Sequence, residues 1–144
     1  MRLTAKSEYG LLAMIELASR YGEGPVSARD IAERRDVPLR FLEQLFVNLR
    51  RSGLVTAVRG ARGGFTLSRD PSLITTLDVV EALEGPLTAS ACDAERGMPC
   101  ENSGSCAAEP VWARATQALR DVFSSTSLAD LASPHHHPST PTRA

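Results

Sequence analysis

The sequence predicts a mainly α-helical protein that carries one small β-hairpin. Apolar residues recur at helical spacing in the stretches 8–21, 39–50 and 109–124. Two short apolar runs, 54–58 and 65–67, have the length and the Gly-rich flank of paired strands. The chain has 144 residues, of which 42% are hydrophobic and 23% charged. We therefore expect one folded domain with an appendage.

Residues 8–21 are expected to form the first helix, because apolar side chains occupy positions 11, 12, 14, 15, 17 and 18. Gly22 and the pair Gly24-Pro25 end this helix. Four glutamates on this and later helices are interpreted as solubility or capping charges: Glu16, Glu33, Glu81 and Glu84.

The next unit consists of a short helix over 28–35 and a longer helix that follows it. Ser27 and Asp30 resemble a capping box at the start of the short helix. The segment 36–38 interrupts the helix, because Pro38 disfavours helical conformation in the residue before it. Pro38 is also well suited to the first turn of the helix that follows. The longer helix ends at Gly53, after two arginines. Two helices joined by a three-residue break are typical of a helix-turn-helix.

The hairpin directly follows this helix pair, and its tip is basic and rich in glycine. The tip, residues 59–64, reads RGARGG. Glycine supplies the positive φ angles of a tight loop and lets the backbone approach a phosphate. A hairpin in this place is a wing, so residues 1–86 are predicted to form a winged helix-turn-helix domain.

The remaining chain divides into a helix, a loop, a helical end and a tail. A short amphipathic helix is expected over 76–85. Residues 87–108 have few apolar side chains and several turn-formers, so this loop cannot become ordered by packing alone. Residues 109–132 are expected to form a long helix over 109–124 and a short terminal helix. The tail, 133–144, is rich in Pro, Ser and Thr and is expected to be disordered.

Charge is divided unevenly along the chain, although the formal net charge is only −1. Residues 1–70 carry 12 Lys and Arg against 8 Asp and Glu, whereas residues 71–144 carry 4 against 9. A basic first half indicates contact with an anion such as DNA. The sequence has no apolar run of membrane-helix length and no signal peptide, so we expect a cytoplasmic protein with reduced thiols and no membrane partner. It also has no nucleophile–base set and no nucleotide-binding motif, which argues against an enzyme.

The second helix of the pair is the expected DNA reader. Its first residues would face base edges in the major groove: Leu39, Arg40, Glu43 and Gln44. Arginine pairs with guanine, glutamate accepts from cytosine and glutamine pairs with adenine. Further contacts are expected from the start of the shorter helix and from the wing: Ser27, Arg29, Arg59, Arg62, Gly63 and Gly64. The alternative is that this surface is only the solvated face of a core helix.

All three cysteines, Cys92, Cys100 and Cys106, fall in the loop 87–108. A disulfide would leave one cysteine over, and buried structural thiols would lack apolar neighbours. Zinc takes three thiolates and one further ligand, although the closely spaced cysteine pairs usual for zinc are absent. Iron–sulfur clusters accept wider spacings and a fourth ligand other than cysteine. The spacing therefore favours a metal and leaves iron–sulfur and zinc both open.

These motifs together resemble the IscR–NsrR family of bacterial regulators. The resemblance rests on MRLTAKSEYGLLAM at 1–14, LEQLF at 42–46, SGLVTAVRGARGGFTL at 52–67 and three cysteines before a long helix. It implies a homodimeric winged helix-turn-helix regulator of double-stranded DNA with a palindromic operator and a long dimerisation helix, whose seam includes Trp112. It also implies a 2Fe–2S or 4Fe–4S cluster on the three cysteines, and a part for Glu43 in the choice of DNA sequence.

The resemblance points to two carboxylates as the fourth cluster ligand. IscR-like members have a histidine three residues after the last cysteine, where this chain has Glu109. NsrR-like members use an acidic residue near the N-terminus, donated by the partner subunit, where this chain has Glu8. We expect Glu8, acting across the dimer, with Glu109 as the alternative.

The sequence thus predicts a dimeric repressor whose operator binding is controlled by an iron–sulfur cluster that senses redox state, nitric oxide or iron–sulfur status. A zinc-stabilised regulator without redox sensing is one alternative. The other is a cluster-carrying module whose winged domain binds a protein.

Overall fold

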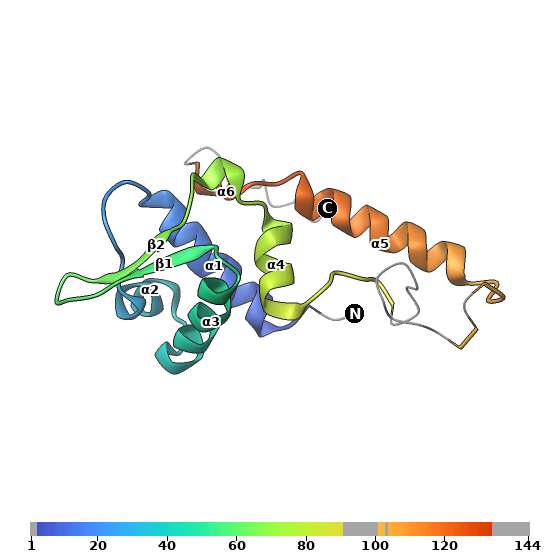
Figure 1. Ribbon diagram of the computed structural model, residues 1–144, viewed down its shortest axis with the longest axis horizontal. Coiled ribbons are helices and arrows are strands. Elements are labelled where there is room, and N and C mark those ends of the chain that lie inside the picture. The colour runs from blue at the N-terminus through green and yellow to red at the C-terminus, as the bar shows by residue number, and fades with distance from the viewer. Residues whose placement is uncertain (1–2, 91–100, 103, 134–144) are drawn as a thin grey trace, which may run out of the picture.

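The computed structural model describes residues 3–90, 101–102 and 104–133. Its elements run in the order α1 (Ala5–Ser19), α2 (Ala28–Arg35), α3 (Leu39–Arg51), β1 (Val55–Val58), β2 (Gly64–Leu67), η1 (Pro71–Leu73), α4 (Thr76–Glu84), α5 (Glu109–Ser124) and α6 (Leu128–Ala132). The predicted fold class, mainly helical with one small hairpin, is confirmed (Figure 1).

α1 begins three residues earlier than the sequence predicted, and a contact from far along the chain explains the difference. Thr4 is the N-cap of this helix. Glu84, at the end of α4, accepts hydrogen bonds from the Thr4 N–H at 3.0 Å and from the Ser7 hydroxyl at 2.8 Å. An acidic group at a helix N-terminus also offsets the positive end of the helix dipole. Glu84 is therefore a capping charge, as expected, but the helix that it caps is α1.

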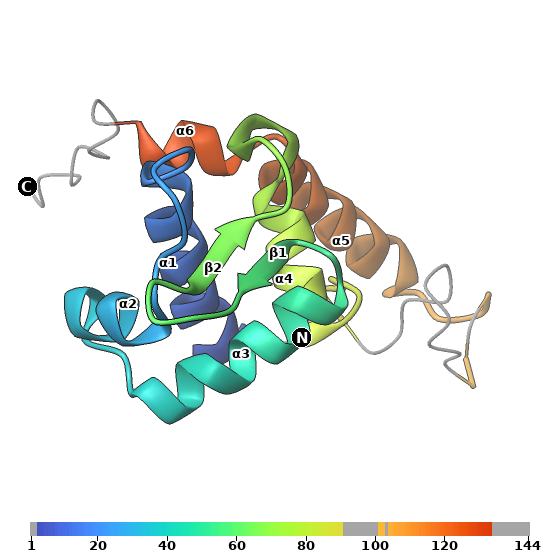
Figure 2. The same cartoon turned by 60° about the vertical axis from the view of Figure 1, so that its left-hand side comes forward.

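α1 lies at the centre of the domain, where it packs against α4, α6, α3, β2 and α2 (Figure 2). The largest side chains that are fully buried in the common core come from five helices and the segment before α4: Met14, Ile31, Leu42, Leu45, Phe46, Leu49, Ile74, Val79 and Leu128. Burial of these apolar side chains is the main favourable term in folding. The winged domain is consequently built around one core that includes the apolar face of α3.

α5 leaves this body instead of joining its core, and both ribbon views show it extending away (Figures 1 and 2). All of its residues are described, and Thr116 alone among them is buried. Val111, Trp112 and Val122 are large apolar residues that stay exposed on this helix. α5 therefore carries apolar surface that the described part of this chain does not cover.

The wing is fastened on both edges of its second strand. On one edge β2 pairs with β1 in antiparallel register, with Val58 opposite Gly64. On the other edge Phe65 exchanges two backbone hydrogen bonds with Val26, at 2.8 and 2.9 Å. Gly64 permits this approach, because a Cβ atom there would lie 2.3 Å from the carbonyl oxygen of Val26. The hairpin is thereby joined to the residue that precedes the cap of α2.

Gly64→Ala should lower the free energy of unfolding by about 1–3 kcal/mol, the usual cost of a side chain with no space. The clash is with the backbone of Val26, so it can be relieved only if β2 moves away from the segment that precedes α2. Urea denaturation followed by circular dichroism measures the change. Thr66→Ala, two residues along the same strand, is the control and should cost less than about 1 kcal/mol. Equal small losses for both variants would contradict the close approach.

Candidate nucleic-acid interface and cysteine-bearing segment

One face of α3 is buried in the core, and the opposite face is exposed and mostly polar. The buried residues of the helix are Leu42, Leu45, Phe46 and Leu49. Helical periodicity leaves the opposite stripe in solvent: Arg40, Glu43, Gln44, Val47, Arg50 and Arg51. This stripe contains three of the four residues predicted to read bases. Leu39 is half-buried and packs against the core, so it does not belong to the stripe.

Three members of this stripe were not predicted from the sequence to read bases, Arg50, Arg51 and Val47, and the apolar one is Val47. It lies one helical turn after Glu43 and two turns after Arg40, on the same face. Its side chain has no hydrogen-bonding group, which was the property by which the predicted base readers were selected. Comparing its phase with that of Leu42, Leu45 and Leu49 could have placed it outside.

The turn between α2 and α3 keeps the two helices at a fixed crossing. Asp36 adopts the left-handed conformation, with φ of 52°, and closes α2. Ser27 caps α2 by accepting a hydrogen bond from the Asp30 N–H at 3.1 Å. The Asp30 carboxylate binds Arg20 and Arg34, so the capping-box interpretation is confirmed only for the serine half. Arg29 and Ser27 are both exposed at this end of α2.

The tip of the wing presents two exposed arginines, Arg59 and Arg62. The tip projects beyond α2, at the end of the molecule opposite to the start of α5 (Figure 1). Gly63 donates its N–H to the Gly60 carbonyl at 3.0 Å, and a Cβ atom at Gly63 would meet the Val58 carbonyl oxygen at 2.2 Å. The two glycines predicted to approach a phosphate, Gly63 and Gly64, thus already have a role in the local backbone. Their contact with DNA stays a prediction.

A buried acidic group fastens α1 to α2. The side chain of Glu16 is only 9% exposed and pairs with Arg35 at 2.9 Å, with Arg34 at 3.8 Å and with Arg20 at 3.9 Å. Its interpretation as a solubility charge is wrong, because three arginines surround it. A second acid extends the network, since Asp30 pairs with Arg20 at 2.5 Å and with Arg34 at 3.1 Å. The network sets how α2 lies against α1.

Three polar contacts join α5 to α4 and to the segment that follows α4. The Thr76 hydroxyl donates to the Phe123 carbonyl at 2.7 Å. Glu81 pairs with Arg120, so Glu81 is a structural partner rather than a solubility charge. The buried Thr116 hydroxyl accepts from the Ala89 N–H at 2.9 Å. We call these contacts, at positions 116, 120 and 123 of α5, the α5 joint.

The segment 85–90 leads from α4 toward the cysteines, and the α5 joint holds it. Leu87 and Thr88 are buried. The Leu87 N–H donates to the Glu81 carboxylate at 3.0 Å. Two anchors, Glu81 and Thr116, therefore fix this segment against α4 and α5.

Of the three cysteines, only Cys106 belongs to the described residues, and Cys92 and Cys100 lie outside them. Cys106 is a free, half-buried thiol just before α5, and its N–H donates to the Asn102 carbonyl at 3.0 Å. Glu109 accepts from the Gly104 N–H at 2.7 Å. Within the described ranges no three His, Cys, Asp or Glu groups lie close enough to hold a metal ion.

The two candidate fourth ligands differ in their surroundings. Glu109 is half-buried and closes the turn that contains Cys106. Glu8 is exposed in the first turn of α1. The exposed carboxylate can be offered to a second chain without breaking a contact that the structure contains.

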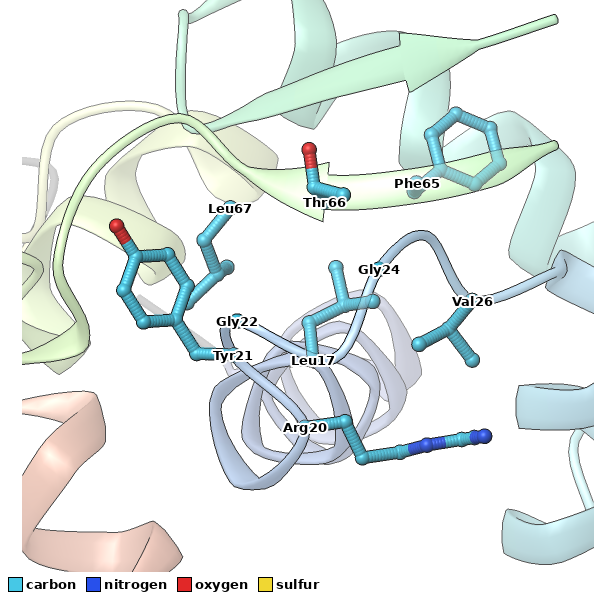
Figure 3. A pocket seen from close by; sticks show the side chains of 9 residues that line it. All are labelled: Leu17, Arg20, Tyr21, Gly22, Gly24, Val26, Phe65, Thr66 and Leu67. Atoms are coloured by element: carbon cyan, nitrogen blue, oxygen red, sulfur yellow. The ribbon is translucent and has the colours of Figure 1, made fainter.

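A hollow of about 370 Å³ lies between the end of α1, the loop after it and β2 (Figure 3). Its wall is mostly apolar and includes Leu17, Val26, Phe65 and Leu67. Arg20 extends along its edge, and its guanidinium is bound to Asp30. The lining residues do not combine a nucleophile with a general base, so the hollow has no catalytic apparatus of that kind.

The chain is similar in sequence to known bacterial transcriptional regulators. Residues 3–134 match the family model Rrf2, described as an iron-dependent transcriptional regulator. The chain is 40% identical over 135 residues to the HTH-type transcriptional regulator CymR of Bacillus subtilis, covering 92% of this chain and 91% of that protein. It is 37% identical over 131 residues to the HTH-type transcriptional regulator IscR of Xenorhabdus nematophila, covering 91% of this chain and 79% of that protein.

Solved structures agree with the sequence relatives. The structure of CymR, described as the global cysteine regulator of B. subtilis, superposes with a TM-score of 0.77 at 38% identity, over 92% of this chain and 96% of that one. T. potens IscR gives a TM-score of 0.74 at 37% identity, over 91% of this chain and 85% of that one. No helix in the described part of the chain combines the length and the apolar character that spanning a membrane requires.

Asp30→Asn should weaken the domain and remove part of its acid sensitivity. Hydrogen bonds from Arg20 and Arg34 hold the pKa of Asp30 below its ordinary value of 3.8. Because the folded pKa is the lower one, the paired carboxylate contributes its full stability above pH 3.8, and the contribution is lost as the pH falls through the folded pKa. Between about pH 7 and about pH 3, the urea midpoint should therefore fall less in the variant than in the unchanged chain. Glu33→Gln, on the exposed side of the same helix, is the control; a fall in Asp30→Asn as large as in the unchanged chain would contradict the pairing.

Proposed function

Because this chain belongs to the Rrf2 family of DNA-binding transcriptional regulators, we propose that it is a homodimeric repressor whose operator affinity is set by an iron–sulfur cluster. Family membership confirms the resemblance stated from the motifs and the prediction that the chain is not an enzyme. The observation that carries the proposal is that all three cysteines lie between residues 92 and 106, directly before α5. The relatives include both IscR proteins and a cysteine regulator, so the sensing half rests on these cysteines rather than on the family.

DNA binding is assigned to the outer stripe of α3 and to the tip of the wing. Arg40, Glu43 and Gln44 are exposed on one face of α3, as direct contact with base edges requires. Arg59 and Arg62 are exposed at the tip and would neutralise phosphates without reading sequence. Phe46 of α3 stacks on Phe65 of β2, with ring centroids 4.1 Å apart. That stacking keeps the helix and the wing in one rigid reading unit.

The second copy is expected on the apolar stripe of α5. Trp112 and Val122 are exposed on this helix and would be covered by the same helix of a partner. A twofold dimer contacts DNA with two identical α3 helices, and a palindromic operator then matches the symmetry of the protein. Such a protein acts where its operators are, which for a bacterial regulator is the cytoplasm.

The donor set fits an iron–sulfur cluster. Thiolates are the ligands that such clusters prefer, and Cys106 is free and half-buried at the base of α5. The residues that would hold the cluster are Cys92, Cys100 and Cys106, with the partner's Glu8 as fourth ligand. Glu109 already accepts a backbone hydrogen bond in its own turn. When bound, a cluster supplies a redox-active centre that oxidants and nitric oxide can destroy.

The α5 joint is the route by which the state of the cysteines would reach DNA. Ligation of all three thiols would order the loop between residues 88 and 108 and hold the segment 85–90 against Thr116 and Glu81. That segment in turn fixes α5 relative to α4, and so sets the distance between the two α3 helices of a dimer. A bias of about 1.4 kcal/mol toward the DNA-competent arrangement gives a tenfold change in operator affinity.

Protein purified without oxygen tests the cofactor assignment. We expect absorption bands in the region of roughly 300–600 nm, as thiolate-bound clusters give, together with iron and acid-labile sulfide. Cys100→Ser should lose all three signals, whereas Ser105→Ala, which leaves the thiols intact, should keep them. A colourless protein with about one zinc per chain would support the zinc-stabilised regulator instead. A metal-free protein that cannot be reconstituted would contradict a metal of either kind.

Thr116→Val should uncouple the cysteines from DNA. Valine has the shape of threonine but lacks the oxygen that accepts from the Ala89 N–H. The ratio of operator dissociation constants without and with the cluster should fall about fivefold, the equivalent of one hydrogen bond of about 1 kcal/mol. The affinity of the cluster-free protein should not change.

Thr116→Ser is the matched control, because it keeps the hydroxyl and should keep the ratio. Fluorescence anisotropy with a labelled operator measures both states of all three proteins. The same ratio in the valine and serine variants would contradict a coupling role for this hydrogen bond.

A further inference from the structure

Val47 of α3 differs in chemical character from the exposed residues around it. The side chain of Val47 is apolar, yet the residue is 54% exposed. The rest of the outer stripe consists of charged or amide side chains: Arg40, Glu43, Gln44, Arg50 and Arg51. Val47 lies in the middle of this row and forms part of two adjoining shallow hollows, one with Arg40, Glu43 and Gln44 and the other with the two later arginines.

No packing contact within the described part of the chain favours valine at this position. The two γ methyl groups of Val47 do not enter the core, which α3 reaches through the opposite face. A β-branched residue also restricts its own side chain in a helix and has lower helix propensity than alanine, leucine or lysine. Residues that break a local rule without a gain in packing are found mostly at functional positions.

The place of Val47 limits what it can contact when α3 lies in a major groove. Three to four residues separate it from Glu43 and Gln44, which corresponds to about 5–6 Å along the helix axis. That rise brings it over a base pair next to those that the two polar residues would read. Valine can neither donate nor accept a hydrogen bond, so it cannot discriminate the polar edges of the bases. The major groove presents one apolar group, the C5 methyl of thymine.

We propose that Val47 is a specificity-determining residue that packs against a thymine methyl group in each half of the operator. The inference rests on the proposed docking of α3 in the major groove and adds a contact to it. It requires an A·T pair, with thymine on the contacted strand, at a fixed distance from the bases read by Glu43 and Gln44. It involves no cysteine and no metal, so it holds in whichever state the protein binds DNA.

Deoxyuridine, which is thymine without this methyl group, is the probe. An operator is first selected from random duplexes with the full-length unchanged protein, and each thymine is then replaced singly by deoxyuridine. At one thymine of each half-site the replacement should weaken binding about fourfold, the effect of one buried methyl-sized group. Val47→Ala should bind the thymine operator more weakly by at least the same factor, and deoxyuridine at that position should have no further effect on it.

Two controls separate this contact from other causes. Val47→Ala should fold at least as well as the unchanged chain, because alanine is the better helix former, and its salt dependence should be unchanged because phosphate contacts remain. Leu73→Ala shortens another exposed apolar side chain, in η1, and should leave the effect of each deoxyuridine replacement as it is in the unchanged chain. If both proteins bind the selected operator specifically and each deoxyuridine replacement weakens Val47→Ala as much as it weakens the unchanged chain, the inference about Val47 is overturned but the proposed function is not. Absence of any sequence preference in the unchanged protein would overturn the proposed function together with it.

Discussion

Burial of one face of α3 is the constraint on which the rest of the structure depends. Leu42, Leu45 and Leu49 must enter the core for the domain to fold, and Phe46 must stack on the wing. Once these side chains are buried, helical periodicity leaves no choice about which residues point outward. The stripe to which we assign DNA binding is therefore set by the same packing that holds the domain together.

α5 is attached to the domain in a different way from α3, as its proposed part in the response to a signal would require. The α5 joint, at Thr116, Arg120 and Phe123, includes two hydrogen bonds and one ion pair to α4 and to the segment that follows it. Each such contact is worth about 1 kcal/mol, whereas loss of a large core side chain costs several times as much. The molecule thus has two parts, a rigid unit of α3 and the wing and a more weakly attached α5. Under the proposed function, the first would determine which DNA is bound, and the second would be where the cysteine-bearing segment acts.

The parts that the sequence predicted well are those with local signals. The break at residues 36–38, the helix on either side of it and the Gly-rich hairpin are defined by neighbouring residues, and all of them appear in the structure. The parts that it missed depend on contacts between distant residues. α1 begins at Ala5 because Glu84, some eighty positions later, accepts from Thr4.

The same limit applied to the candidate site. The polar residues of α3 could be selected from their chemistry, but Val47 was passed over because its side chain has no hydrogen-bonding group. Glu16 was taken for a surface charge because no local pattern reveals that three arginines from two elements surround it. Thr116 gave no signal at all, since a threonine in an amphipathic helix becomes informative only when its partner, the Ala89 N–H, is known.

The central claim is that ligation of the three cysteines changes the affinity for DNA. It is tested most directly by the operator dissociation constant of one anaerobic preparation, measured before and after removal of its cluster. Transmission through the α5 joint predicts at least a tenfold difference between the two states, which corresponds to about 1.4 kcal/mol. If the protein is shown to have lost its cluster and the operator dissociation constant is nevertheless the same before and after the loss, the claim is contradicted.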